Sequence, residues 1–286
     1  MPINVGEKTG TLYLVGTPIG NLGDITLRAI ETLKNVDLIA AEDTRQTRKL
    51  LNHLEIEKPL TSYFEHNKLV KGPQLIAELQ TGKNIALVSD AGMPGISDPG
   101  TELVQTCITN NIPTIVIPGP TALITGLVAS GLSTDGFVFV GFFPRAKAAQ
   151  KKLLDQLARE PRTLIFYESP HRLLTTLERL QEFLGDRRCC VARELTKIYE
   201  EYRRGTISEL LASFSTGSIR GEIIIIVEGC KEEEGQGISF SWEEILNEVK
   251  VLREEGMSLG EASKIVAQKY GMRKREIYNY VSKEVE

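Results

Sequence analysis

Cysteine and histidine are scarce in this sequence, which limits the chemistry that it can carry out. Among 286 residues there are 4 cysteines and 3 histidines. No two cysteines have the CxxC spacing of zinc and redox sites, and the histidines are far apart along the chain. We therefore expect neither a disulfide framework nor a metal centre, and any catalysis should be metal-free.

Long apolar runs and a large net charge are also absent. No apolar run reaches the ~18 residues of a membrane-spanning helix, and residues 1–10 lack the basic start and apolar core of a signal peptide. The formal net charge of −4 argues against a surface that coats nucleic acid, though not against a local basic patch. We expect a cytoplasmic protein without membrane contact.

Two common nucleotide-binding signatures are missing as well. The sequence has no GxxxxGK[ST] loop, and its first strand-to-helix junction has glycines at positions 16, 20 and 23, which is not the GxGxxG fingerprint. A dinucleotide-dependent dehydrogenase is therefore not indicated. Asp24 closes this junction, and two roles are open for it: the N-cap of the next helix, which the pattern favours, or a ligand-binding carboxylate.

The most informative stretch that is present is IALVSDAGMPGISDPG, residues 85–100. It predicts a short buried strand and then a long loop, which ends where an amphipathic helix begins at Thr101. In open α/β sheets, such loops at strand carboxyl ends form the ligand crevice. The glycines let a ligand approach the backbone, and the prolines restrict the loop before binding. An ordinary strand-to-helix turn is the alternative, but such turns have about 2–6 residues.

Strand-like and helix-like segments alternate on both sides of this stretch. The alternation predicts an α/β protein with a parallel sheet, and the length predicts two α/β domains flanking a cleft. The first domain (1–118) has predicted strands at 12–15, 37–41, 85–89 and 114–117, and helices at 25–35 and 44–54. The second (119–230) has predicted strands at 137–143, 163–167, 189–192 and 222–227, and helices at 147–159, 171–184 and 207–214.

Charged residues follow the second predicted strand. Glu42, Asp43 and Arg45 come directly after it, at the same edge of the sheet as the long loop. Asp43 is either a cap of the next helix or a functional group, and the residues favour neither. His66 lies in a predicted loop, SYFEHN at 62–67, which suits a base or sugar but is also typical of surface packing.

The end of the chain has a helix-turn-helix pattern. Residues 231–241, with three consecutive glutamates, predict a linker, and 242–286 predict a helical extension with helices at 242–255, 259–270 and 274–283. Arg273, Lys274 and Arg275 begin the last helix, where basic side chains and free amides favour phosphate. A small helical packing module with a solvated charged face is the alternative.

Several long segments resemble one family. The segments are LYLVGTPIGNLGDITLRAIETLKNVDLIAAEDTR, ALVSDAGMPGISDPG, PGPTALITGLVASGL and GFFPR. They are similar to the ribosomal RNA small subunit methyltransferase I proteins of the tetrapyrrole methylase superfamily, from Thr11 to about Gly229. The tail resembles that family's C-terminal extension. Met93 departs from the family, whose members usually have threonine there.

The resemblance implies a tetrapyrrole methylase-like fold that binds S-adenosylmethionine in the cleft, usually in a homodimer. The implied reaction is 2′-O-methylation of the ribose of a cytidine in the decoding region of 16S rRNA, as naked RNA or in the assembled small ribosomal subunit. The residues implied to bind the cofactor are Pro18, Asp90, Ala91, Gly92, Met93, Ile96, Ser97, Thr121, Ala122, Glu168 and Leu195.

Methyl transfer from a sulfonium is an in-line displacement that depends mainly on alignment. The ribose hydroxyl must still lose its proton, and the candidate bases are Asp43, Asp24 and His66, with Arg45 holding a phosphate or sugar. Two other functions stay open: a methylase of a tetrapyrrole precursor or another small or protein substrate, and a non-catalytic RNA-binding protein. A tetrapyrrole methylase would be expected to have a GGDP-type loop where this chain has AGMP at 91–94, so RNA is favoured.

Overall fold

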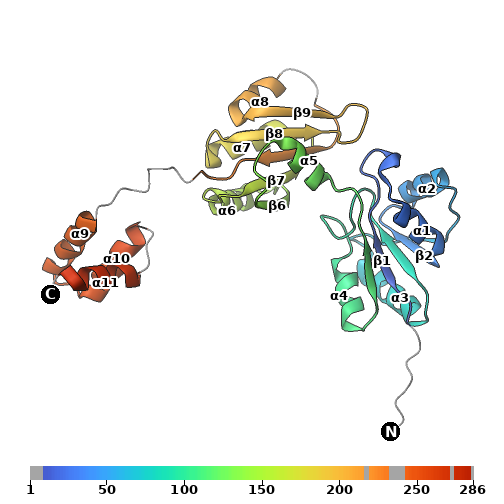
Figure 1. Ribbon diagram of the computed structural model, residues 1–286, viewed down its shortest axis with the longest axis horizontal. Coiled ribbons are helices and arrows are strands. Elements are labelled where there is room, and N and C mark those ends of the chain that lie inside the picture. The colour runs from blue at the N-terminus through green and yellow to red at the C-terminus, as the bar shows by residue number, and fades with distance from the viewer. Residues whose placement is uncertain (1–8, 216–218, 232–241, 271–273, 285–286) are drawn as a thin grey trace, which may run out of the picture. The chain divides into compact units, whose positions relative to one another are not determined.

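The computed structural model describes residues 9–215, 219–231, 242–270 and 274–284. The chain divides into two compact units, Met1–Cys230 and Lys231–Glu286, and Figure 1 labels the elements of each. The first unit contains two separate five-stranded sheets, and the second is helical. The predicted fold class is therefore confirmed, while the boundary between 118 and 119 stays a prediction.

The first sheet is wholly parallel, with the strand order β3-β2-β4-β1-β5. Its strands are β1 (Leu12–Val15), β2 (Leu38–Ala41), β3 (Leu60–Ser62), β4 (Ile85–Val88) and β5 (Thr114–Ile117). From β2 the chain continues to β3 on one side, whereas from β4 it continues to β5 on the other side. The loops after these two neighbouring strands leave in opposite directions, and a ligand crevice opens at such a point in doubly wound sheets.

Helices cover both faces of this sheet because its strands are apolar on both faces. One face packs against α1 (Leu27–Asn35) and α2 (Thr44–His53), the other against α3 (Lys68–Gln80) and α4 (Thr101–Thr109). Thr26 is the N-cap of α1, since its side chain accepts a hydrogen bond from the amide of Ala29. Asp24 instead ends the short 3₁₀ helix η1 (Leu22–Asp24), so its predicted N-cap role is wrong.

The second sheet is mixed, with the order β6-β7-β10-β8-β9. Only β6 and β7 pair in parallel, and the other pairs are antiparallel. Its strands are β6 (Phe137–Phe142), β7 (Thr163–Glu168), β8 (Arg188–Arg193), β9 (Glu201–Thr206) and β10 (Ile223–Val227).

Four helices enclose the second sheet. One face packs against α6 (Lys147–Leu157), α7 (Leu173–Leu184) and α8 (Ile207–Phe214), and the other against α5 (Ala122–Ser130). Ile19, from the loop after β1, packs into the apolar cluster beneath α5. This contact ties the first βα loop to the second sheet.

Several elements differ from the sequence prediction. The pattern does not predict β3, α3 or β9, because β3 is very short, α3 contains Pro73, and β9 is a charged edge strand. Helix α7 begins at Leu173 rather than at His171, since the residues before it form a turn in which the amide of Arg172 donates to the carbonyl of Ser169.

The C-terminal unit consists of α9 (Trp242–Glu254), α10 (Leu259–Tyr270) and α11 (Lys274–Glu284) around a small apolar core. Trp242 stacks on Tyr280 with 4.1 Å between ring centroids, which joins its first and last helices. The predicted linker glutamates 232–234 and Arg273 lie outside the described residues. Among the helices that are described, none is both long and apolar enough to cross a membrane.

Candidate active site

A cavity of about 430 Å³ lies between the carboxyl ends of the first sheet and the second α/β domain. Its walls come from the long loop after β4, from the residue after β2, and from loops and strand ends of the second domain. All the residues implied to bind the cofactor line it, except Pro18. With the exception of Pro18, the sequence-derived set is thus brought together in space.

The loop after β4 is held in place by backbone contacts. The amides of Thr17 and Gly92 donate to each other's carbonyls, at 2.9 and 3.0 Å. Gly92 has a φ of +80°, which L side chains rarely adopt. Next to this bridge, a Cβ on Gly16 would lie 2.7 Å from Cα of Gly119. The loop is therefore formed before a ligand arrives, which lowers the entropic cost of binding.

Three carboxylates of the first domain face this cavity: Glu42, Asp90 and Asp98. Burial raises the pKa of all three, that of Asp98 to about 6, because the charged form is poorly solvated. Within the described residues, no lysine or arginine forms an ion pair with any of them. The cavity therefore has a negative potential that favours a cationic ligand.

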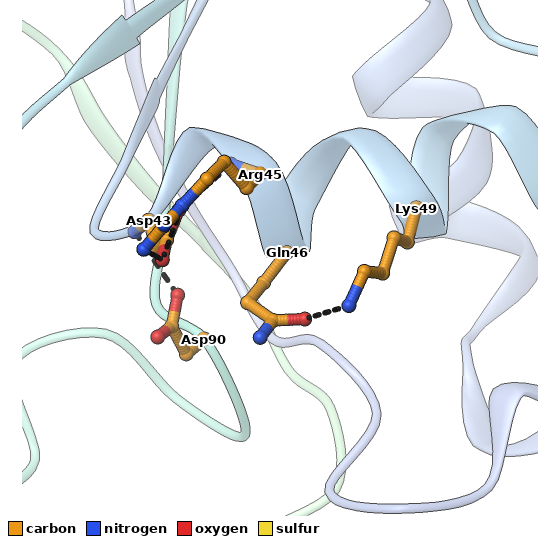
Figure 2. Close-up of polar contacts among 5 residues, drawn as sticks. All are labelled: Asp43, Arg45, Gln46, Lys49 and Asp90. Carbon is orange, nitrogen blue, oxygen red and sulfur yellow. Dashed lines mark hydrogen bonds and ion pairs between the residues drawn. The ribbon is translucent and has the colours of Figure 1, made fainter.

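Asp43 and Arg45 lie next to the cavity but do not line it. Figure 2 shows the amide of Asp43 donating to Oδ1 of Asp90, at 3.0 Å, and Arg45 paired with the Asp43 carboxylate at 2.7 Å. The same carboxylate accepts from the amide of Arg45, so Asp43 caps α2. Hydrogen bonds from Arg45 lower the pKa of Asp43 to about 2, which makes this carboxylate a weak base.

The remaining candidates differ in their surroundings. The carboxylate of Glu168 is buried, and it accepts from the amide of Ser169 at 2.7 Å and from the hydroxyl of Thr176 at 2.6 Å. Its hydrogen-bonding capacity therefore goes largely to the protein itself. Neither Asp24 nor His66 lines the cavity, and the ring of His66 packs edge-on against Phe64.

A second cavity of about 500 Å³ adjoins the first, and it contains Pro18. Sequence reasoning missed this cavity, and it did not single out Asp98 or Phe142 as site residues. Asp98 lies within the motif that was singled out, and Phe142 within the GFFPR segment. The signal for both was present, but the sequence does not tell which side chains of a loop turn inward.

These features define a class of protein: a two-domain α/β protein with an anionic, apolar-walled cleft for a small cationic ligand. In the part of the chain that the structure describes, no three histidine, cysteine, aspartate or glutamate side chains are grouped as a metal site requires.

Comparisons with known proteins give the family. The sequence pattern described as Tetrapyrrole (Corrin/Porphyrin) Methylases matches residues 11–211. A protein of Synechocystis sp. named ribosomal RNA small subunit methyltransferase I is 51% identical, over 94% of this chain and 96% of that protein. One of the same name from Bacillus subtilis is 49% identical, over 98% and 96%. The chain therefore belongs to the tetrapyrrole methylase family and, within it, to the ribosomal RNA small subunit methyltransferase I proteins, so it is a methyltransferase.

Solved structures share the fold. The methyltransferase CobJ matches with a TM-score of 0.58 at 18% identity, over 78% of this chain and 95% of that one. Uroporphyrin-III C-methyl transferase from Thermus thermophilus, complexed with S-adenyl homocysteine, matches with a TM-score of 0.55 at 21% identity, over 76% and 97%. The family resemblance and the fold predicted from the sequence are both confirmed.

Proposed function

We propose that the protein transfers a methyl group from S-adenosylmethionine to the ribose 2′-oxygen of a cytidine in the decoding region of 16S rRNA. The observation that carries the proposal is the anionic cavity at the crevice of the first sheet, in a chain about half identical to rRNA methyltransferases over nearly its whole length. The naked RNA and the assembled small subunit are both possible acceptors, which the experiment below compares.

The residues of the cavity fit this cofactor. S-adenosylmethionine has a positively charged sulfonium and an ammonium group, and it supplies an activated methyl group when bound. Glu42, Asp90 and Asp98 provide the opposite charge, while Phe142 and Tyr167 provide apolar surface for a purine ring. Loss of the methyl group removes the sulfonium charge, so the same carboxylates hold the product less tightly than the substrate.

The geometry favours Asp90 over the earlier candidates as the general base. Asp90 lines both cavities, and burial raises its pKa toward the range of a working base. The amide of Asp43 donates a hydrogen bond to the carboxylate of Asp90 and so orients it. The carboxylate of Asp43 itself is held by Arg45. Asp24 and His66 line neither cavity.

The C-terminal unit is proposed to recruit the RNA. Lys274 and Arg275 lie in the first turn of α11, where side-chain charge and free backbone amides favour phosphate. Cutting the chain near residue 239 should leave cofactor affinity unchanged, weaken binding to the subunit and lower its salt dependence. If this unit is instead a packing module, truncation changes the melting temperature or oligomeric state and leaves the salt slope as it was.

We also propose that the protein is a homodimer in the cytoplasm. The edge strand β5 exposes Ile115 and Val116, and α5 exposes Ile124 and Val128. Apolar side chains exposed in pairs on two elements favour burial in a subunit interface. Sedimentation of the full-length protein measures this oligomeric state directly.

The decisive experiment is radiolabelled methyl transfer to small subunits from cells that lack the modification, followed by mapping of the modified nucleotide. Naked 16S rRNA is the parallel acceptor, and a tetrapyrrole precursor is the control for the alternative methylase. We expect label on one cytidine ribose. Cofactor binding without transfer to either RNA acceptor, or transfer to the tetrapyrrole, contradicts the proposal.

A further inference from the structure

The second cavity adjoins the cofactor cavity and shares a wall with it. Ile19, Asp90, Ala91 and Glu222 line both cavities. The two spaces are therefore separated by a single layer of residues. The volume of the second cavity, about 500 Å³, lies within the range of small-molecule sites, about 300–1,000 Å³. A molecule in this space would lie directly beside the cofactor.

Helix α2 contributes three polar residues to this cavity: Gln46, Thr47 and Lys49. Gln46 and Lys49 lie on successive turns of this helix, just after the cap at Asp43, as Figure 2 shows. Nζ of Lys49 donates to Oε1 of Gln46, at 3.0 Å. Lys197, the other cation in the lining, is paired with Glu194 and Glu222, at 3.0 and 3.1 Å.

This difference in pairing leaves Lys49 as the cation available to a ligand. Within the described residues, its only recorded partner is a neutral amide, so its charge is not compensated by a carboxylate. A lysine of this kind is suited to a phosphate group. The amide of Gln46 both donates and accepts, as recognition of a base edge or a sugar hydroxyl requires. Leu22 and Leu50 add apolar surface for a ring.

We propose that the second cavity holds the target nucleotide of the RNA, with Gln46 contacting its base or sugar and Lys49 its phosphate. This inference rests on the proposed function and names the acceptor subsite of the same reaction. A nucleotide lodged in a cavity cannot stay stacked in a helix, so the acceptor must be unpaired or flipped out of its stack. The shared wall at Asp90 and Ala91 then lies between the acceptor sugar and the cofactor.

A filling variant tests the proposal with the full-length protein. Gln46 is exposed in the first turns of α2, so Gln46→Trp should fold, and its indole should occupy the second cavity. We expect methyl transfer to small subunits to fall at least about tenfold, with the calorimetric affinity for S-adenosylmethionine within about twofold of wild type. Arg48→Trp is the matched control, since Arg48 is exposed on the same helix but lines neither cavity.

A charge variant gives an independent measurement. Lys49→Gln should raise the KM for subunits several-fold and lower the salt slope by about one phosphate contact, about 0.7–0.9, whereas Arg48→Gln should change both less. The cavity assignment is overturned if Gln46→Trp retains full methyl transfer, or if it loses cofactor affinity as strongly as transfer. It is also overturned if the Arg48 control variants have the same effects as Gln46→Trp and Lys49→Gln. If wild-type protein binds cofactor but methylates no RNA acceptor, the proposed function itself fails, and the assignment fails with it.

Discussion

The two α/β domains contribute different chemistry to the cofactor cavity. The first domain supplies Glu42, Asp90 and Asp98, whose carboxylates have no cationic partner among the described residues. The carboxylates that the second domain supplies are already partnered: Glu168 with protein hydrogen bonds, and Glu222 with Lys197. The first domain therefore determines the charge of the cavity, and the second determines mainly its apolar shape.

The topology of the two sheets explains the difference. In the parallel first sheet, every strand ends at the same edge, so the polar residues after β2 and β4 meet there. In the second sheet, β9 and β10 run antiparallel to β7 and β8, so the carboxyl ends of these two pairs of strands lie at opposite edges. Apart from Glu168, the residues of its strands that line the cavity are apolar or aromatic, such as Tyr167 and Ile224. Variants on each side should therefore have different effects on binding, charge dependence and rate.

The largest effect is expected beside the cavity at Gly16, where the chain after β1 crosses the chain after β5. A Cβ there would lie 2.7 Å from both Cα of Gly119 and Sδ of Met93, so Gly16→Ala must push two backbone segments apart. Overpacking of this kind costs about 1–3 kcal/mol, and the displaced loop should no longer bind cofactor measurably. Urea unfolding and calorimetry check this.

The control for Gly16→Ala is Gly131→Ala, at a φ of +77° with no atom within 4 Å of the added Cβ. It should lose about 1–2 kcal/mol from backbone strain alone and bind cofactor normally. Normal cofactor binding by a folded Gly16→Ala protein contradicts the view that this crossing holds the loop.

The next largest effect is expected at Asp90, on the rate rather than on folding. Asp90→Asn removes the proposed base while retaining an oxygen that accepts from the amide of Asp43. Single-turnover methylation should fall about 10²–10⁴-fold, far more than cofactor affinity. Asp43→Asn is the control, because asparagine is as good an N-cap as aspartate. If Asp43→Asn has the larger effect on the rate, Asp43 is the base and Asp90 is not.

The carboxylates of the first domain should bind S-adenosylmethionine, the cofactor before transfer, more tightly than S-adenosylhomocysteine, the product left after transfer. Asp98→Asn removes one half-buried negative charge, and we expect the affinity for S-adenosylmethionine to fall about tenfold, or about 1.4 kcal/mol. The affinity for S-adenosylhomocysteine should fall less, since its sulfur is uncharged. Calorimetry with both ligands measures the ratio. An equal loss for both would mean that Asp98 contacts the shared part of the molecule and does not act through charge on the sulfur.

The raised pKa of Asp98 predicts opposite pH dependences for binding and stability. Its folded-state pKa of about 6 is above the ordinary value of 3.8, mainly because of burial. The contribution of Asp98 to stability is therefore fully present below about pH 4 and is lost as pH rises through about 6. Affinity for the cationic cofactor should instead increase over the same interval. Asp98→Asn should flatten this part of both profiles, and a wild-type affinity that is constant from pH 5 to 7 would contradict the assignment.

The sequence predicted the helices and strands better than it predicted which way their side chains point. The strands β1 and β5 and the helix α8 match their predicted bounds. The two strands are short apolar runs, and the helix is an amphipathic segment that follows the N-cap Thr206. The edge strand β9 carries charged residues and was missed. The site motifs were found because Gly, Pro and Asp leave a local signature. The second cavity depends on the proximity of residues that are distant in sequence, such as Gly20 and Lys197, where a Cβ on Gly20 would lie 2.6 Å from Cγ of Lys197. No local pattern encodes such proximity.

The smallest effect is expected from the apolar wall of the second domain. Phe142 lines the cavity and lies edge-on to Tyr167, with 5.5 Å between ring centroids, but it is 62% exposed. Because so much of the ring already faces solvent, Phe142→Ala should cost only about 0.5–1.5 kcal/mol of binding energy. The loss should be the same for substrate and product, since an uncharged ring does not discriminate between a sulfonium and a thioether through net charge.

Phe137→Ala is the matched control for this last change, because Phe137 lies on the same strand and does not line the cavity. It should leave both affinities unchanged. A cation can also bind the face of an aromatic ring, and in that case Phe142→Ala would weaken S-adenosylmethionine more than S-adenosylhomocysteine. Such a result would move part of the charge discrimination to the second domain, and the division between a charged half and an apolar half would no longer hold.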